Sequence, residues 1–189
     1  MRRTWVFGYG SLVAPSSVAR TIDRIIDQPD ERVVTHLHGY GRRWNYGSQL
    51  LRGNWTTDGI SVRDGVVVSL GLAVSPVEWC NGVSILVHGE ELDALCARES
   101  DYELTDITDQ VAVDADRIDG RVVTFVPRPG SVERYRRARD EHRAAVRADY
   151  VKIVHAAFDE LGPDHRRLFD QTPDADVPVA DIELIRRAR

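Results

Sequence analysis

The stretch TWVFGYGSLVAPSSVARTIDRII, residues 4–26, places two closely spaced glycines between an apolar segment and an amphipathic one. Residues 4–7 are β-branched or aromatic and stop at Gly8, which predicts a short buried strand. Pro15 and Ser16 then begin a segment whose apolar residues have helical spacing, which predicts a helix. Its apolar residues are Val18, Ala19, Ile22, Ile25 and Ile26.

The turn between these two elements, GYGSL at residues 8–12, is suited to binding an anion. Two glycines let the backbone curl so that successive N–H groups point into one hollow, and the following helix adds its positive N-terminal end. Such a hollow takes a carboxylate or a phosphate, and a plain tight turn is the alternative. A dinucleotide-binding fingerprint and a serine-hydrolase elbow are both rejected, because each needs glycine where Val13 stands.

The rest of the chain predicts strands first and helices later. Residues 52–64 are rich in Gly, Asn, Asp and Thr, so they predict a loop or a β-excursion. A short helix is expected over 89–97 with Leu92 and Leu95 facing inward. Further strands are expected at 31–46, 66–74, 82–87, 102–113 and 121–126.

The last third of the sequence predicts helices. Ser131 is expected to cap an Arg-rich helix, and residues 150–161 have an apolar face that ends at Gly162-Pro163. This order of elements favours the α+β class, with a small mixed β-barrel surrounded by helices. We expect a single domain over 1–189 with a helical C-terminal third, 131–189.

Composition narrows the function classes. The net charge of −5 disfavours nucleic-acid binding, and the six arginines from Arg134 to Arg147 alternate with acidic residues, as on a solvated helix face. No apolar run approaches a signal peptide or a membrane span. Cys80 and Cys96 are expected to be reduced thiols of a cytoplasmic protein. His36 and His38 have no third ligand at useful spacing, so no metal is expected.

Arg98-Glu99 falls where the predicted helix over 89–97 gives way to the strand that starts at Tyr102. A carboxylate at such a junction can point into a pocket while the two elements hold it still. The alternative is a solvated charge or a salt bridge between Glu99 and Arg98.

Taken together, these motifs resemble the γ-glutamylcyclotransferase-like family. The loop at 7–12 resembles the family's signature loop after the first strand, and Leu12 leans toward its bacterial and glutathione-specific branches. The segment at 92–99 resembles the stretch that delivers the catalytic glutamate, although Ser100-Asp101 precede Tyr102 where glycine often follows directly. The order of motifs holds over most of residues 4–162, and the other matching segments are 37–45, 81–83 and 150–153.

The resemblance implies an enzyme that cleaves a γ-glutamyl amide by attack of its own α-amine, giving 5-oxoproline without a cofactor. It implies Glu99 as general acid and base. The N–H groups of Gly10, Ser11 and Leu12 would bind the α-carboxylate of the substrate. Two further residues, Tyr9 and Tyr150, would form the pocket walls. The Arg-rich segment between Ser131 and Asp149 resembles an insertion, so Tyr135 is a second candidate for the position given to Tyr150.

The expected partner is a small γ-glutamyl substrate such as glutathione or a γ-glutamyl peptide, bound by a monomer or a homodimer. Two other classes remain open. One is a non-catalytic protein that binds a small ligand in the same pocket. The other is a structural or nucleic-acid-associated protein that acts through the Arg-rich helix.

Overall fold

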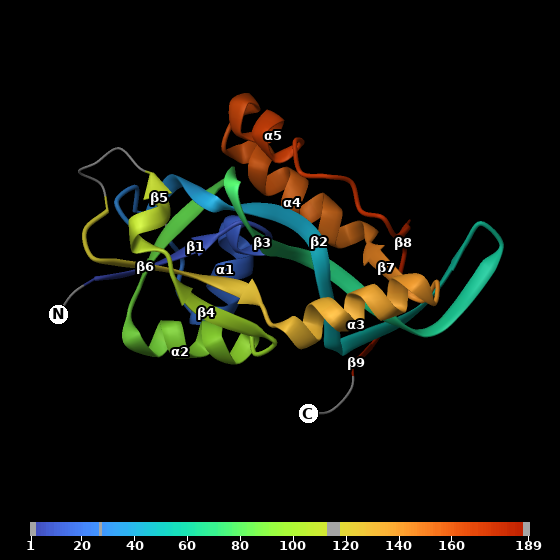
Figure 1. Cartoon of the computed structure of the whole chain (residues 1–189). Coiled ribbons are helices and arrows are strands. Elements are labelled where there is room, and N and C mark those ends of the chain that lie inside the picture. The colour runs from blue at the N-terminus through green and yellow to red at the C-terminus, as the bar shows by residue number, and fades with distance from the viewer. Residues whose placement is uncertain (1–2, 27, 113–117, 187–189) are drawn as a thin grey trace.

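The computed structural model describes residues 3–26, 28–112 and 118–186, in which helices pack around one bent, mixed β-sheet (Figure 1). The helices are α1 (Pro15–Ile22), α2 (Gly89–Arg98), α3 (Pro129–Asp140), α4 (Ala148–Glu160) and α5 (Pro163–Phe169), with short 3-10 turns η1 (Ser11–Val13) and η2 (Thr108–Gln110). The strands are β1 (Thr4–Gly8), β2 (Arg32–Thr57), β3 (Ile60–Val87), β4 (Tyr102–Asp106), β5 (Val111–Ala112), β6 (Arg121–Pro127), β7 (Ala144–Arg147), β8 (Val179–Ala180) and β9 (Glu183–Arg186).

The first strand lies in the middle of the sheet, whose main order is β4-β6-β1-β3-β2-β5 among the described residues. β1 pairs antiparallel with β3 and parallel with β6. The side chains of Trp5, Val6 and Phe7 are almost fully buried, which agrees with the short buried strand predicted from residues 4–7. A strand with neighbours on both sides fixes the position at which the next loop leaves the sheet.

Of the two alternatives predicted for residues 52–64, a loop or a β-excursion, the structure has the β-excursion. These residues belong to the long antiparallel hairpin of β2 and β3, which turns at Asp58 and Gly59. Both turn residues have positive φ angles, 51° and 77°, the signature of a two-residue turn whose twist matches the strands. The polar composition of this segment is therefore that of a hairpin arm extending away from the main body (Figure 1).

The predicted strands at 66–74 and 82–87 are parts of one continuous strand, β3. Pro76 does not end it, because the register skips there: Tyr40 pairs with Val74, and His38 pairs with Trp79. A bulge accepts a proline because a bulged residue need not donate a hydrogen bond to the neighbouring strand, and the proline nitrogen carries no hydrogen to donate.

Several predicted boundaries differ from the structure. Helix α1 ends at Ile22, because Asp23 adopts a left-handed conformation and takes Ile25 and Ile26 out of the helix. The strand predicted over 102–113 breaks after Asp106 into η2 and β5, and Val113 lies outside the described residues.

The C-terminal third holds the predicted helices but also three short strands, β7, β8 and β9. β7 adds to β3 in parallel, and β9 pairs with β2. Ser131 lies inside α3 rather than at its cap, because Arg128 occupies the cap position. The Ser131 hydroxyl instead donates to the carbonyl of Asp101, which ties α3 to the start of β4.

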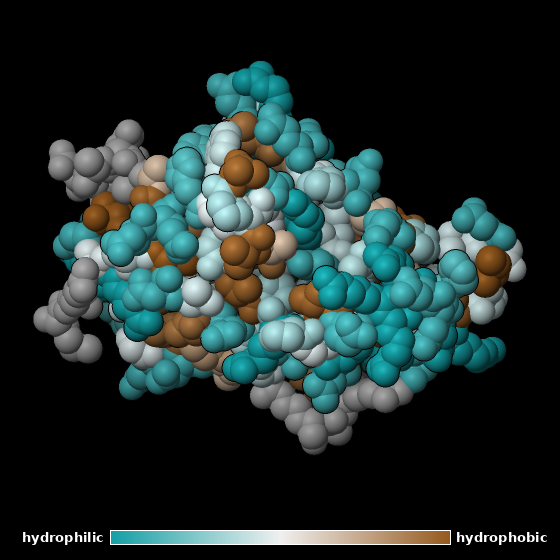
Figure 2. Space-filling view, in the orientation of Figure 1, coloured by the Kyte–Doolittle hydropathy of each residue, from teal (hydrophilic) through white to brown (hydrophobic). Residues whose placement is uncertain are grey.

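The main core lies between the sheet and helices α1, α2 and α4. The amphipathic helix predicted at 150–161 is confirmed as α4, and Val154, Ala157 and Phe158 are its buried residues. Hydrophilic residues cover most of the face shown in Figure 2, and apolar residues form scattered patches on it. Within the described ranges, none of the helices has the length and apolar character needed to cross a membrane.

Candidate active site

The glycine turn leaves the centre of the sheet at the end of β1. The amide of Val13 donates to the carbonyl of Gly10 at 2.9 Å, which closes the single turn η1. A Cβ atom built on Gly8 would lie 2.7 Å from Cβ of Leu12, so the chain can fold back this closely only with glycine at position 8. The structure has the predicted turn after the first strand.

Tyr150, at the start of α4, reaches this turn from a distant part of the sequence. A Cβ atom on Gly10 would lie 2.9 Å from the phenol oxygen of Tyr150, so the missing side chain of Gly10 makes room for the phenol. Burial raises the pKa of Tyr150 to about 12, and Glu99 contributes to the rise. Hydrogen bonds with the backbone of Leu70 and Ser11 oppose it, so the phenol oxygen is held against the turn.

Glu99 caps the C-terminus of α2, and its backbone is held from both sides. Its N–H donates to the carbonyl of Leu95 at 2.9 Å, and its carbonyl accepts from the N–H of Tyr102 at 2.8 Å. Only 17% of its side chain is exposed. Burial raises the pKa of the Glu99 carboxyl, and the nearby guanidinium of Arg98 only partly offsets this effect. The acid therefore holds its proton to higher pH than a solvated glutamate.

The side chain of Arg98 joins the acid to the turn, a role that the sequence did not predict. Its Nε lies 2.9 Å from Oε1 of Glu99, and one Nη donates to the hydroxyl of Ser11 at 3.1 Å. The other Nη donates to the carbonyl of Ser17 and the hydroxyl of Thr21 in α1. The salt bridge between Glu99 and Arg98, which was the alternative to a functional Glu99, is thus present, and Arg98 also contacts the glycine turn. Adjacency to Glu99 was the only signal for Arg98 in the sequence.

All six residues predicted for the site line one small cavity of about 30 Å³, enough for one water-sized group. These residues are Tyr9, Gly10, Ser11, Leu12, Glu99 and Tyr150, and the lining is completed by Leu70, Tyr102 and Phe125. Segments from distant regions of the chain thus meet at one point.

A larger cavity of about 840 Å³ shares four lining residues with the small one: Ser11, Glu99, Tyr102 and Tyr150. Its remaining lining mixes both charges and apolar groups, including Arg20, Arg98, Asp101, Arg147, Asp149 and Ile153. Cavities of this size hold small molecules. The buried acid therefore lies at the junction of a narrow end and a wide space.

Two tyrosine hydroxyls of the wall are already engaged. Tyr9 donates to the carbonyl of Phe125 at 2.6 Å, and Tyr102 donates to the carbonyl of Leu70 at 3.0 Å. Burial raises the pKa of both phenols well above the ordinary value, and the charge of Glu99 adds to the effect. Both rings are therefore neutral and fixed, which suits them to shape a pocket.

Tyr135, the second candidate for the pocket tyrosine, lies elsewhere. It belongs to a separate apolar cluster with Val66 and Ala144, and its hydroxyl donates to the carboxylate of Asp176. Neither of the two cavities around Glu99 includes it. Tyr150 is the one that the structure places beside the turn.

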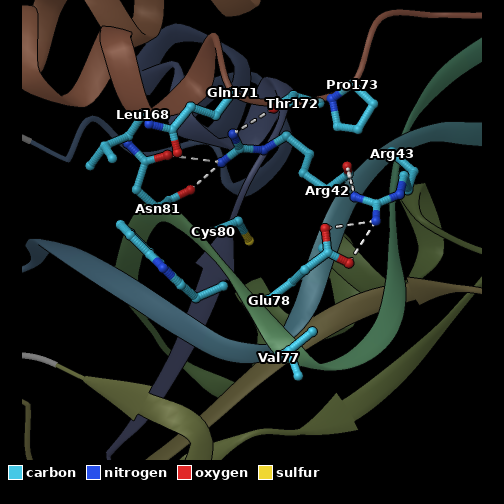
Figure 3. Close-up of a pocket in the computed structure, with 12 residues that line it drawn as sticks. Arg42, Arg43, Val77, Glu78, Cys80, Asn81, Leu168, Gln171, Thr172 and Pro173 are labelled. Carbon is cyan, nitrogen blue, oxygen red and sulfur yellow. Dashed lines mark hydrogen bonds and ion pairs between the residues drawn. The ribbon is translucent and has the colours of Figure 1, made fainter.

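A different cavity, of about 210 Å³, contains the buried Arg42 (Figure 3). Its guanidinium bonds to the carbonyl and side chain of Asn81 and to the hydroxyl of Thr172, and it lies over the rings of Phe158 and Phe169. Burial lowers the pKa of this guanidinium. These contacts join the hairpin to α4 and α5, which is a structural role.

His36 and His38 lie on β2 against Trp79. Burial lowers the pKa of His36, and the nearby His165 adds to this. In the part of the chain that the structure describes, no cluster of three or more His, Cys, Asp or Glu side chains could hold a metal ion.

The fold and the site define a class of protein: an α+β domain in which a buried carboxylate meets a glycine turn at the end of a central strand. A family model described as ChaC-like protein matches residues 4–149. The chain therefore belongs to the ChaC-like family, a γ-glutamylcyclotransferase family. Membership supports γ-glutamylcyclotransferase activity in general terms. The comparison with curated proteins finds no match.

Solved structures show the same fold. A protein titled gamma-glutamyl cyclotransferase superposes with a TM-score of 0.56 at 15% identity, covering 92% of this chain and 90% of its own. An uncharacterized protein from Homo sapiens gives 0.56 at 14% identity, covering 93% and 91%. The YkqA protein of Bacillus subtilis gives 0.54 at 16% identity, covering 93% of this chain and 57% of its own. The predicted γ-glutamylcyclotransferase-like α+β fold is confirmed.

Proposed function

We propose that the protein cleaves a γ-glutamyl amide by internal attack and releases 5-oxoproline and a free amine. The α-amine nitrogen of the substrate attacks its own γ-carbonyl carbon, and the new N–C bond closes a five-membered ring. The amide C–N bond then breaks. The α-ammonium nitrogen loses two protons in becoming the lactam N–H. One goes to the departing nitrogen to make the free amine, and the second protonates that amine or passes to solvent, so no water is consumed.

Glu99 carries both proton transfers in this proposal. As a carboxylate it accepts a proton from the α-ammonium group, and as a carboxylic acid it gives that proton to the leaving amine. A general acid and base works best when its pKa lies near the working pH. The burial that raises the pKa of Glu99 moves it in that direction, and the opposing charge of Arg98 keeps the ionised form accessible.

The glycine turn binds the α-carboxylate of the substrate. The N–H groups of Gly10, Ser11 and Leu12 provide the donors, and the carboxylate would lie beside the phenol of Tyr150, which contacts the backbone of Ser11. The hydroxyl of Ser11 accepts a hydrogen bond from Arg98, which leaves its own proton available for the substrate. Tyr9 and Tyr150 form the walls.

Holding the substrate's α-amine next to its γ-carbonyl carbon would supply much of the rate enhancement. Holding an internal nucleophile against its target contributes about 7–11 kcal/mol in well-oriented reactions. Only a group as small as the α-carboxylate would enter the narrow cavity beside the turn, and the rest of the substrate would lie in the wide cavity of about 840 Å³, which Glu99 also lines. This arrangement needs only a small substrate with a γ-glutamyl group at one end.

The observation that carries the proposal is that Glu99 and the glycine turn line one cavity. The test is to incubate the full chain with glutathione, γ-glutamyl dipeptides and γ-glutamylamines, and to measure 5-oxoproline. Formation from at least one compound, dependent on Glu99, is the expected result. Tight binding of these compounds with no product from any of them would instead identify a non-catalytic binding protein.

A further inference from the structure

A basic cavity of about 380 Å³ lies between α3 and the β2–β3 hairpin, apart from the site described above. Four of its lining residues are arginines and one is an acid, whereas the whole chain carries a net charge of −5. Figure 2 shows hydrophilic residues gathered over α3 on this side of the molecule. The lining residues are Gln49, Arg52, Val66, Arg134, Arg137, Ala138, Glu141 and Arg143.

Two of these arginines are fixed from the hairpin side. An Nη of Arg52 and an Nη of Arg143 both donate to the carbonyl of Asp64, at 2.5 and 3.2 Å. The carboxylate of Asp64 lies 3.4 Å from Nε of Arg52 and does not line the cavity. Asp64 has a φ angle of 50°, a left-handed conformation that a non-glycine residue adopts at a cost. Its carbonyl holds two guanidinium groups side by side, which brings like charges together.

The other two arginines extend from α3. Arg134 donates to the carbonyl of Gly47 at 2.7 Å and lies 3.4 Å from the carboxylate of Asp101. For Arg137 no side-chain partner is found within the described ranges, and its side chain is exposed. Two of the four arginines have carboxylate partners outside the lining, Arg52 with Asp64 and Arg134 with Asp101. The remaining positive charge of this concave space comes from Arg137 and Arg143, against the one acid of the lining, Glu141. Concave charge of one sign concentrates the local field.

We propose that this cavity binds a small phosphate-bearing anion. Planar guanidinium forks match the paired oxygens of phosphate, and several forks around one hollow suit a group that carries more than one negative charge. The volume fits a small molecule rather than a nucleic-acid strand. The lining also contains no aromatic ring on which a base could stack.

The test is calorimetric titration of the full chain with inorganic pyrophosphate at fixed ionic strength. In the double variant Arg137→Gln/Arg143→Gln we expect binding to weaken by about tenfold or more, the size of effect given by losing charge-assisted hydrogen bonds. The matched control is Arg136→Gln, since Arg136 is exposed on the same helix and does not line the cavity. The control should bind pyrophosphate as the wild type does. Arg134 is left unchanged because it also contacts Asp101 in the large cavity.

Three results would overturn the proposal. The first is no binding of pyrophosphate at millimolar concentration by a folded wild-type chain, and the second is equal loss in the control and the double variant. The third is a lack of preference for pyrophosphate: citrate binds as tightly as pyrophosphate, or an RNA oligonucleotide binds far more tightly than pyrophosphate through the same arginines. Because binding is measured without substrate, the outcome is independent of the cyclotransferase activity.

Discussion

Replacing Glu99 by glutamine separates the chemistry of the site from its folding. The amide has the shape of the carboxyl group but neither accepts nor returns a proton at neutral pH. We expect the rate of 5-oxoproline formation to fall by about 10²–10⁴-fold, the usual contribution of a positioned general acid and base. Michaelis constants should change little, because the proposed carboxylate anchor at residues 10–12 is untouched.

The same substitution should stabilise the fold at neutral pH. Burial raises the pKa of Glu99 in the folded chain above its unfolded value of 4.5. The stabilising effect of the protonated acid is therefore complete below pH 4.5 and is lost as the pH rises through the folded pKa. A tenfold difference in acid strength between the folded and unfolded chain corresponds to about 1.4 kcal/mol of unfolding free energy. Each kcal/mol moves the melting temperature of a chain of this size by about 2–4 °C.

Arg98 limits this gain, since Glu99→Gln removes the carboxylate that its Nε contacts. The guanidinium keeps its bonds to Ser17 and Thr21, so it is not left without partners. We expect the melting temperature of the variant to exceed that of the wild type at pH 8 and the difference to shrink toward pH 4.5. Melting curves across this pH range, together with 5-oxoproline assays, check both parts. Turnover of the variant within about threefold of the wild-type value would refute the proposed role of Glu99. A gain in melting temperature over wild type that is smaller at pH 8 than at pH 5 would refute the argument from burial.

Three further substitutions probe the neighbours of Glu99, and Tyr135→Phe serves as a control away from it. Gly10→Val should raise the Michaelis constant by about tenfold or more, because the new Cβ would collide with the phenol of Tyr150; an unchanged constant would count against the anion-binding turn. Tyr150→Phe should lower kcat/KM by about tenfold through loss of one hydrogen bond, whereas Tyr135→Phe should lower stability only. Equal losses of activity in the two variants would contradict the assignment of Tyr150 as the pocket tyrosine. Arg98→Met should move the acidic limb of the kcat/KM profile to higher pH, because Arg98 lowers the pKa of Glu99; a limb that moves to lower pH would be inconsistent with this.

The convergence of these residues on one cavity was predictable because each part has a local signal. Glycines between a strand and a helix indicate a backbone hollow, and a carboxylate at a helix end indicates a held acid. The prediction of Tyr150 over Tyr135 rested on the helix that follows it, and only Tyr150 lies at the cavity. The contact of Arg98 with the hydroxyl of Ser11 was not predictable, because it depends on how α1 packs against α2.

The fold was less predictable where a local pattern has two outcomes. The polar run at 52–64 suits a loop and a solvent-exposed hairpin equally, and the choice depends on pairing with β3 and β9. Pro76 lies between the two strands expected at 66–74 and 82–87, but a bulge opposite Gly39 accommodates it within β3, and Gly39 has a φ angle of 82°. β7 is four residues long and forms because β3 offers it an edge. Such strands carry no sequence period long enough to detect.

The pairing of Glu99 with Arg98 resolves a conflict that any such enzyme meets. A fully solvated acid would be ionised at neutral pH and could not return a proton to the leaving amine, whereas a buried acid without a cation would stay protonated and could not take one. Partial burial raises the pKa, and the guanidinium at 2.9 Å opposes the rise. Because that guanidinium also bonds to Ser11, the proposed mechanism would couple substrate binding at the turn to the protonation of the acid through one side chain. In that mechanism, a substrate carboxylate near Ser11 would compete for the charge of Arg98, which would raise the pKa of Glu99 further and prepare it to act as the acid.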